Sequence, residues 1–278
     1  MAAKSDPAGV SIQPTARFRA TVHFDGTGFH GWQVQPSQRT VQGDLEECLA
    51  RLVGEPTRID AAGRTDTGVH AVAQEIAFDA PRRWTAADLR RALNALLPAD
   101  VWIETARDAD PDFHPRFQAS GRRYEYLVGT SPDAVSPLSA HRLWAVCQPL
   151  DLDTLAGESR QLTGSHDFTC LSKSGQPERG TECRVERAEW SGDGEGRLCF
   201  TIVADRFLHH MVRYIVGTLV EIALGRRAGG ELERLLSGAA GVRPPIPAPP
   251  YGLYLTGVRY GSEWNHPEMF STRQVEDR

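Results

Sequence analysis

The residues most capable of chemistry lie in one short segment, Gly63-Arg64-Thr65-Asp66-Thr67-Gly68-Val69-His70. Its two glycines bracket an arginine and an aspartate, and glycine supplies the positive φ that tight turns need. The segment holds no second carboxylate, no cysteine and no Ser-His arrangement, so Asp66 is typical of a nucleophile rather than of an acid/base pair. Glycoside hydrolysis, which usually requires two carboxylates, is disfavoured. The alternative is a polar turn in which Arg64 and Asp66 neutralise each other.

Strand-like runs flank this segment and belong to an ordered set of elements in the first half of the chain. Alternating apolar residues predict a strand over 17–24, and Thr40 is placed to cap a helix that Gly54 ends. Thr85 is placed to open a second helix that ends at Pro98. Further strands are predicted at 58–62, 72–78 and 101–105. This order of elements is that of a ferredoxin-like fold.

The second half of the chain carries a similar mixture of elements. Strands are predicted at 121–129, 142–147, 183–190, 198–204 and 252–260, and helices at 152–162, 206–224 and 231–236. Asp205 is placed to cap the longest of these helices, in which Met211 falls on the apolar stripe. We therefore predict an α+β fold, in which two ferredoxin-like α/β halves with mostly antiparallel sheets enclose a central active-site cleft.

The sequence predicts two folded domains with a flexible segment at each end of the chain. They are a disordered N-terminal segment over 1–15, an N-terminal α/β domain over 16–111 that carries the Asp66 loop, a C-terminal α/β domain over 112–262, and a flexible tail over 263–278.

Composition narrows the class of protein. The 278 residues are 40% hydrophobic and 24% charged, and no apolar run is long enough for a transmembrane helix. The start of the chain lacks the apolar core of a signal peptide, so we expect a cytoplasmic protein with no membrane partner. Five scattered cysteines without a C-x-x-C pair predict reduced thiols and no zinc site.

The distribution of charge bears on the partner. The net charge of −5 argues weakly against a nucleic-acid partner, but a basic face matters more than the sum. Nearly every cation is an arginine, which suits phosphate recognition, and four doublets occur, at 82–83, 90–91, 122–123 and 226–227. The sequence leaves open whether these doublets share one face.

The Asp66 segment resembles the active-site motif G-R-T-D-A-G-V-H of the tRNA pseudouridine synthase family that acts on the anticodon arm, with Thr67 in place of the commoner alanine. Other segments of the chain agree with the same family in the same order. They include Phe24-Asp25-Gly26, Gly31-Trp32-Gln33, Arg122-Arg123-Tyr124-Glu125-Tyr126, Phe207-Leu208-His209-His210-Met211-Val212-Arg213 and Gly252-Leu253-Tyr254-Leu255. Together they extend the resemblance from about residue 17 to residue 260.

This resemblance implies a tRNA pseudouridine(38–40) synthase, an isomerase that converts uridine to pseudouridine at tRNA positions 38, 39 and 40 and works as a homodimer without cofactor or metal. It implies that Asp66 is the catalytic nucleophile and that Tyr124, Arg64 and Arg213 contact the substrate. The matching family arginine makes Arg213 the candidate cationic partner that favours the ionised form of Asp66. Consistently, the sequence has no Walker loop, dinucleotide fingerprint or metal-ligand cluster. His70, His209 and His210 are expected to be structural and are left out of the catalytic set.

Two rival functions are open at this point. One is an RNA-binding protein that has kept the fold and lost turnover, although the intact Arg64, Asp66 and Tyr124 argue against it. The other is an aspartyl phosphatase or ATPase, suggested by Asp66-Thr67-Gly68, although the lysine expected directly after the aspartate is absent.

Overall fold

The fold is that of one long twisted sheet, described here from a computed structural model over residues 14–173 and 180–270. The described residues form eleven strands, with the order β4-β1-β3-β10-β5-β9-β8-β7 along the main path and β2, β6 and β11 attached to β3, β5 and β10. Most neighbouring strands are antiparallel, and β10 with β3 and β5 with β6 are the parallel pairs. This confirms the predicted α+β fold, with one continuous sheet where two were expected.

The N-terminal half follows the predicted order of elements. Its elements are β1 (Thr15–Phe24), η1 (Gly26–Gly28), α1 (Val41–Val53), β2 (Asp60–Ala61), β3 (His70–Pro81), α2 (Ala86–Leu96) and β4 (Val101–Asp108). β2 is shorter than predicted because the main chain of Ile59 bonds to side chains of α1 instead of to a strand. Its N–H donates to Glu46 (2.9 Å) and its carbonyl accepts from Gln42 (3.2 Å).

The helix α1 shows how local signals set an element. The Thr40 hydroxyl accepts a hydrogen bond from the Gly43 N–H, and Gly54 ends the helix with a φ of 92°. The apolar face of α1 packs with α2, β1 and β3 in one hydrophobic cluster. That cluster forms the core beneath the N-terminal half.

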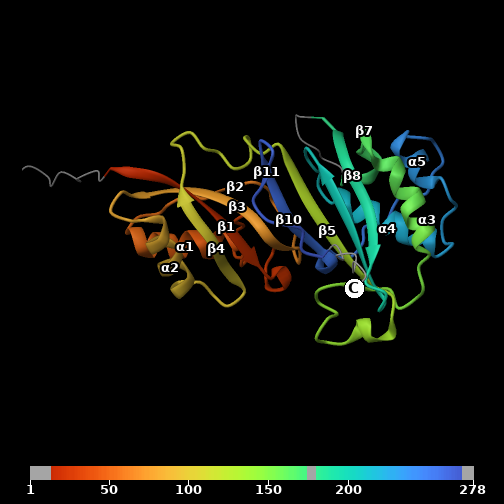
Figure 1. Cartoon of the computed structure of the whole chain (residues 1–278), viewed down its shortest axis with the longest axis horizontal. Helices are drawn as coiled ribbons and strands as arrows, with labels where there is room; N and C mark the ends of the chain where they lie inside the picture. The colour runs from red at the N-terminus through yellow and green to blue at the C-terminus, as the bar shows by residue number, and fades with distance from the viewer. Residues whose placement is uncertain (1–13, 174–179, 271–278) are drawn as a thin grey trace, which may run out of the picture.

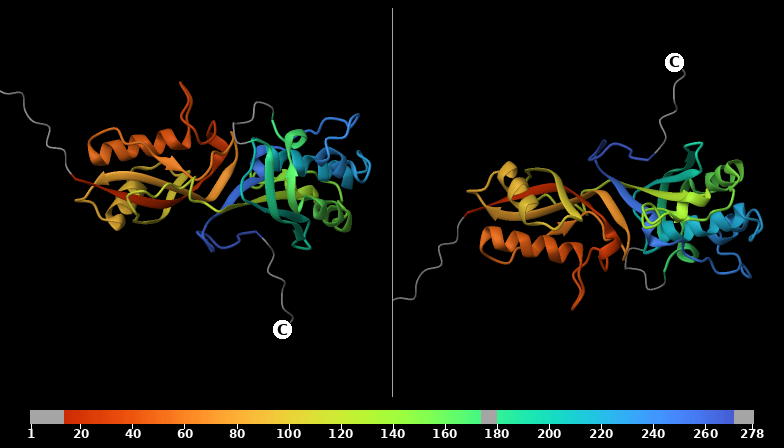
Figure 2. Two further views of the ribbon diagram at one scale, coloured as in Figure 1. Left: turned by 90° about the horizontal axis from the view of Figure 1, so that it is seen from above. Right: turned by 90° about the horizontal axis from the view of Figure 1, so that it is seen from below.

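The C-terminal half builds a second core. Its elements are β5 (Gly121–Gly129), η2 (Pro132–Val135), β6 (Trp144–Ala145), α3 (Leu152–Ser159), η3 (Arg160–Leu162), β7 (Gly164–Asp167), η4 (Thr169–Leu171), β8 (Glu182–Gly192), β9 (Arg197–Ala204), α4 (Met211–Ala223), α5 (Glu231–Leu236), η5 (Pro250–Gly252), β10 (Leu253–Tyr260) and β11 (Glu263–Trp264). α3, α4 and α5 pack with β5, β8 and β9 in this second core. Figures 1 and 2 show the two halves as separate lobes at the two ends of the sheet.

The longest predicted helix begins later than expected. Residues 206–210 are not helical, and α4 starts at Met211, which is buried in the core as predicted. The Asp205 carboxylate accepts hydrogen bonds from the N–H groups of Arg184 and Arg206 instead of capping the helix. His210, with a φ of 63°, turns the chain into α4. The prediction of a helix from residue 206 is therefore wrong. The helical spacing of apolar residues extends upstream of Met211 into residues that form a loop.

The last long strand joins the two halves. β10 lies between β3 and β5, so that Leu255 pairs with Ala71 on one side and with Tyr124 on the other. In Figure 1, β10 occupies the middle of the molecule, next to β5. This insertion brings the start of β3, where the Asp66 segment ends, close to β5.

Residues 263–270 pack against the sheet and differ from the flexible tail expected over 263–278. Residues 263–264 pair with β10, and the Asn265 side chain donates to the Ala73 carbonyl (3.1 Å) and to the Glu75 carboxylate (3.0 Å). The Phe270 N–H donates to Glu125 (3.1 Å). Residues 271–278 and 1–13 lie outside the described part of the chain, and Thr15 already belongs to β1.

No helix in the described ranges is long and apolar enough to cross a membrane. All five cysteines are free thiols, as predicted.

Candidate active site

The Asp66 segment connects β2 to β3 and is held by hydrogen bonds from two directions. The Trp32 N–H donates to the Thr65 carbonyl (3.0 Å), and the Gln74 side chain on β3 donates to the Gly63 carbonyl (2.8 Å). These bonds fix the main chain on both sides of the segment. Asp66 is therefore presented by a constrained turn.

Two glycines of the neighbouring loop allow its main chain to approach this turn. A Cβ atom on Gly26 would lie 2.0 Å from the Val69 carbonyl oxygen, and one on Gly31 would lie 2.7 Å from that of Thr65. Gly31 also has a φ of +84°. Side chains at these two positions would push the Asp66 turn away.

His70 is structural, as the sequence analysis expected. Its Nδ1 accepts a hydrogen bond from the Gly26 N–H (3.0 Å), and its Nε2 lies 3.1 Å from the Tyr251 carbonyl oxygen, which can only accept. Its ring stacks on Tyr254 with the centroids 4.7 Å apart. Burial lowers the pKa of His70, so the ring is neutral and locks the end of the turn.

The Asp66 carboxylate is surrounded by three nitrogen-bearing side chains from the start of α4 and the residues before it. Oδ1 lies 3.2 Å from Nε2 of His209, and Oδ2 lies 3.3 Å from Nε2 of His210 and 3.5 Å from Nη1 of Arg213. The Asp66 side chain is 20% exposed, so it is sheltered but open to a substrate. The sequence predicted Arg213 as its partner, and the structure brings the two together.

Arg213 is held in place rather than free on the helix surface. Its side chain is 13% exposed, and its Nε donates to the Ala248 carbonyl (2.8 Å), while the Ala248 N–H donates to the Arg213 carbonyl (2.9 Å). Its Nη1 faces Asp66, whose negative charge it complements.

Tyr124 lies on β5 beside this carboxylate. Burial, together with the nearby negative charge of Asp66, raises the pKa of Tyr124 to about 12. The ring packs edge-on against Phe207, with the centroids 4.9 Å apart. At neutral pH the phenol is protonated, so it is a poor proton acceptor.

These side chains line one cavity of about 970 Å³. Among the described residues that line it, Asp66 is the single carboxylate, and six residues carry fixed positive charge: Arg64, Arg116, Arg122, Lys173, Arg206 and Arg213. Arg64 is exposed, and its side chain makes no hydrogen bond or ion pair with Asp66 in the described structure. The simple turn in which Arg64 neutralises Asp66 is therefore not what the structure contains.

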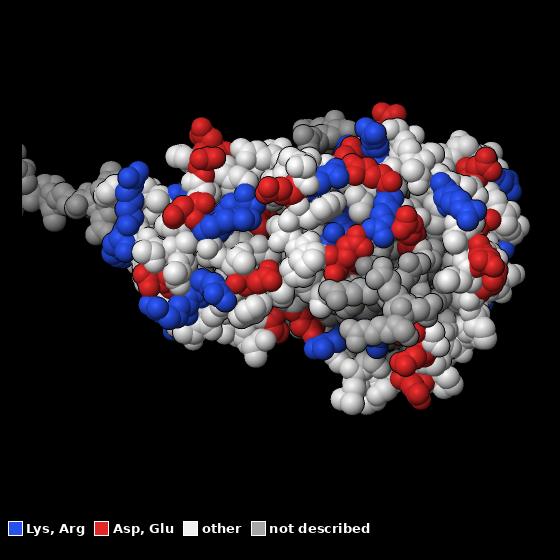
Figure 3. Space-filling model, viewed as in Figure 1, with Lys and Arg blue, Asp and Glu red and all other residues white. Residues whose placement is uncertain are grey.

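The arginine doublets do not form one basic face. Arg122 lines the cavity, but Arg123 is buried against the segment 263–270, and Arg227 is buried in ion pairs with Glu221 and Glu231. On the face of the molecule in Figure 3, positive and negative side chains are interspersed. Among the described residues, the Lys and Arg side chains that gather in one place are the six that line the cavity.

His209 and His210 contact the Asp66 carboxylate, although they were expected to be structural. They precede Arg213 by four and three residues, a spacing that would put all three side chains on one face of the helix predicted from residue 206. That spacing could have grouped them with Arg213. Burial lowers the pKa of His210, and the nearby charges of Arg213, His209 and Lys173 lower it further against the opposing effect of Asp66.

The ligand atoms of Asp66, His209 and His210 lie within 4.8 Å of one another, a separation at which they could hold a metal ion. The guanidinium of Arg213, 3.5 Å from the same carboxylate, opposes a divalent cation there. The arrangement instead pairs the carboxylate with a fixed positive charge.

The comparisons with known proteins identify the family of the chain. The sequence profile of the family described as tRNA pseudouridine synthase matches residues 20–118 and 159–261, which include Arg64, Asp66 and Arg213, whereas Tyr124 lies between the two matched segments. The chain belongs to this family, whose members are isomerases.

Named relatives cover nearly the whole chain. Proteins called tRNA pseudouridine synthase A from Solidesulfovibrio magneticus and Geobacter sulfurreducens are each 40% identical to it, covering 89% and 86% of this chain and 92% and 97% of their own lengths. The protein of that name from Bacillus licheniformis is 38% identical, over 88% of this chain and 99% of its own length. A solved Cbf5-Nop10-Gar1 complex is 9% identical with a TM-score of 0.37, covering 86% of this chain and 58% of that chain, which is too distant to add to the assignment.

Proposed function

We propose that this protein isomerises uridine to pseudouridine at positions 38, 39 and 40 of the tRNA anticodon stem-loop, with Asp66 as the nucleophile. The observation that carries the proposal is that Asp66 is the single carboxylate among the described residues that line a cavity together with six Lys and Arg residues. Such a cavity attracts a polyanion and offers one group able to attack it.

The reaction requires one bond to be exchanged for another at the same ribose carbon. The N1–C1′ bond of uridine breaks, the uracil turns, and a C5–C1′ bond forms while the C5 proton leaves and N1 gains one. No oxidant, reductant or energy source is needed. Asp66 starts the exchange by attack at C1′ or at uracil C6, or by initiating elimination from the ribose.

The neighbouring side chains have separate roles in this proposal. Arg213 holds the Asp66 carboxylate in place by its own bond to Ala248. Arg64, exposed in the cavity, contacts the flipped-out nucleotide, because a base in a stem must leave the stack before its glycosidic bond is accessible. Tyr124 stacks on the uracil ring, and its protonated phenol donates a hydrogen bond.

The partners follow from the same proposal. We infer that the substrate is tRNA, that two copies of the chain act together as a homodimer, and that the protein works in the cytoplasm. Sedimentation of the purified chain with and without tRNA tests the second inference. A single-chain mass at all concentrations would contradict it.

The proposed positions are tested with three tRNA transcripts, each with uridine at only one of positions 38, 39 and 40. Carbodiimide labelling followed by reverse transcription locates pseudouridine at nucleotide resolution. We expect a stop at each single uridine and none in a transcript that lacks all three. Modification elsewhere in the tRNA would overturn the assigned positions, and tight binding without any stop would favour the RNA-binding rival.

A further inference from the structure

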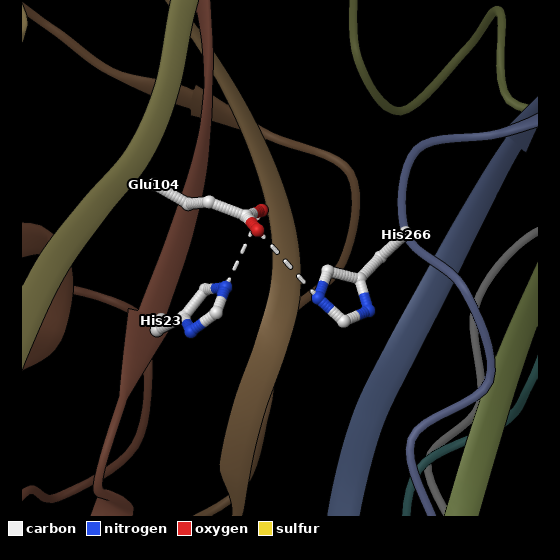
Figure 4. Close-up of side chains that lie close together, drawn as sticks. All are labelled: His23, Glu104 and His266. Carbon is white, nitrogen blue, oxygen red and sulfur yellow. Dashed lines mark ion pairs between the residues drawn. The ribbon is translucent and has the colours of Figure 1, made fainter.

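A second cluster of metal-binding side chains lies outside the Asp66 cavity. It consists of His23 on β1, Glu104 on β4 and His266 in the segment after β11, and one ligand atom of each lies within 4.8 Å of the other two. Figure 4 shows both histidine rings directed at the carboxylate between them. None of the three lines the cavity that contains Asp66.

The β-sheet itself directs Glu104 towards the histidines. Thr21 pairs with Thr105 and Val22 pairs with Ile103, so Glu104 is the extra residue of a β-bulge between β1 and β4. A bulge re-aims the side chain that it carries and is frequent next to functional sites. His23, two residues beyond Thr21, is thereby brought next to Glu104.

The third ligand is positioned by the segment that folds back on the sheet. The buried side chain of Arg123 donates hydrogen bonds to the carbonyls of His266 (2.9 Å) and Pro267 (2.7 Å). The side-chain oxygen of Asn265 accepts from the Val258 N–H (2.8 Å). These contacts hold His266 against the edge formed by β1 and β4.

The separations of the ligand atoms fit a tetrahedral ion. Nε2 of His23 lies 3.4 Å from Oε2 of Glu104, and Nε2 of His266 lies 3.7 Å from Oε1. Zinc bonds of about 2.0 to 2.1 Å at tetrahedral angles separate neighbouring ligand atoms by roughly 3.3 Å. Nε2 of His23, Nε2 of His266 and one carboxylate oxygen of Glu104 lie within 4.8 Å of one another, so they would move closer together to bind one ion at these distances.

The hydrogen bonds leave the right nitrogen atoms available. Nδ1 of His266 lies 2.9 Å from the Pro267 carbonyl oxygen, which only accepts, so Nδ1 carries the proton and Nε2 has a free lone pair. Nε2 of His23 is buried and makes no hydrogen bond in the described structure. Two such nitrogens and a carboxylate are electron-pair donors that a shared cation would satisfy.

We propose that His23, Glu104 and His266 bind one divalent transition-metal ion, with zinc as the best fit, and that this ion fastens the segment 263–270 to the β1–β4 edge. Two imidazoles and one carboxylate are a ligand set that zinc accepts, with a fourth position for water. His23 also lines a separate cavity of about 550 Å³.

Metal binding by the full-length chain tests the proposal. The purified protein is stripped with a chelator and titrated with zinc sulfate against a competing chelator, and with cobalt(II) as a probe whose visible spectrum reports tetrahedral coordination. We expect one zinc per chain and a rise in Tm on its addition. His266→Ala and the isosteric Glu104→Gln should each weaken zinc binding by about tenfold or more and abolish that rise.

Two controls separate this site from other histidines. His141→Ala, in a histidine that belongs to neither cluster, and His209→Ala, in the Asp66 cluster, should bind zinc as the unaltered chain does. No stoichiometric zinc binding by the folded chain would overturn the proposal. Binding that persists in both Glu104→Gln and His266→Ala, or that is lost in His209→Ala, would also overturn it by placing the metal elsewhere.

Discussion

Nη1 of Arg213 lies 3.5 Å from Oδ2 of Asp66, while Nε of the same arginine donates to the Ala248 carbonyl. One guanidinium thus links the start of α4, the loop before β10 and the turn that carries Asp66. Lysine carries the charge but lacks the planar fork that makes both contacts at once. The role of Arg213 is therefore geometric as well as electrostatic.

We expect Arg213→Lys to lower kcat for pseudouridine formation by about tenfold or more, with a smaller change in KM, because the carboxylate loses its fixed partner. Steady-state kinetics on a tRNA transcript measure this. The matched control is Arg226→Lys, in an exposed arginine outside the cavity, which should be unchanged. A variant at residue 213 with normal kcat would show that the contact with Asp66 is dispensable.

Arg64→Ala tests a residue that contributes little to the fold. Its side chain is exposed in the cavity, so we expect the free energy of unfolding to change by no more than about 0.5 kcal/mol. Loss of its contact with the flipped nucleotide should lower kcat/KM by about tenfold or more. Denaturant unfolding and kinetics are measured on the same sample. A large loss of stability would instead assign Arg64 to holding the turn.

Substitutions of Tyr124 can distinguish the contribution of its aromatic ring from that of its hydroxyl. Because its pKa is about 12, the phenol stays protonated at neutral pH, and Tyr124→Phe keeps the stacking surface. We expect Tyr124→Phe to lower kcat less than about tenfold and Tyr124→Ala to lower it much further. Equal loss in the two variants would identify the hydroxyl as the essential group.

Because of His210, the free energy of unfolding is expected to fall as the pH falls. Its folded pKa is lowered by burial below the ordinary value of 6.5, so the unfolded chain takes up the proton first as pH falls. The stability that His210 contributes is present above about pH 6.5 and is lost as pH falls through its folded pKa.

We expect His210→Asn to lose less stability than the unaltered chain between pH 7.5 and 5. Asparagine tolerates the positive φ at this position, so the comparison isolates the titration. Urea unfolding at the two pH values measures it. An equal loss in both proteins would show that His210 does not couple protonation to folding.

Local signals predicted much of the fold. Thr40 and Gly54 bound α1 because a side-chain cap and a left-handed glycine act within a few residues of the helix ends. The order of elements in the N-terminal half followed from such signals. The start of α4 did not, because the apolar period of the helix continues through the turn at His210, whose side chain lies 3.3 Å from Asp66, a residue distant in the sequence.

The Asp66 segment could be found from residue types and resemblance, but its surroundings depend on strand neighbours. The pairing of Leu255 with both Ala71 and Tyr124 places the two halves of the site together, and sequence order does not specify which strands pair. The cluster of His23, Glu104 and His266 was missed for the same reason, since its members come from three distant elements. Sequence patterns indicate local secondary structure, whereas both sites form only when strands that are distant in the sequence pair in a particular register.

The central claim is that Asp66 starts a uridine isomerisation. The direct measurement is tritium release from unmodified tRNA labelled at uracil C5, without added metal or nucleotide, by the unaltered chain, Asp66→Ala and the isosteric Asp66→Asn. We predict release by the unaltered chain alone, with all three proteins folded and able to bind tRNA. Release by Asp66→Asn, or none by the folded unaltered chain, would contradict the claim.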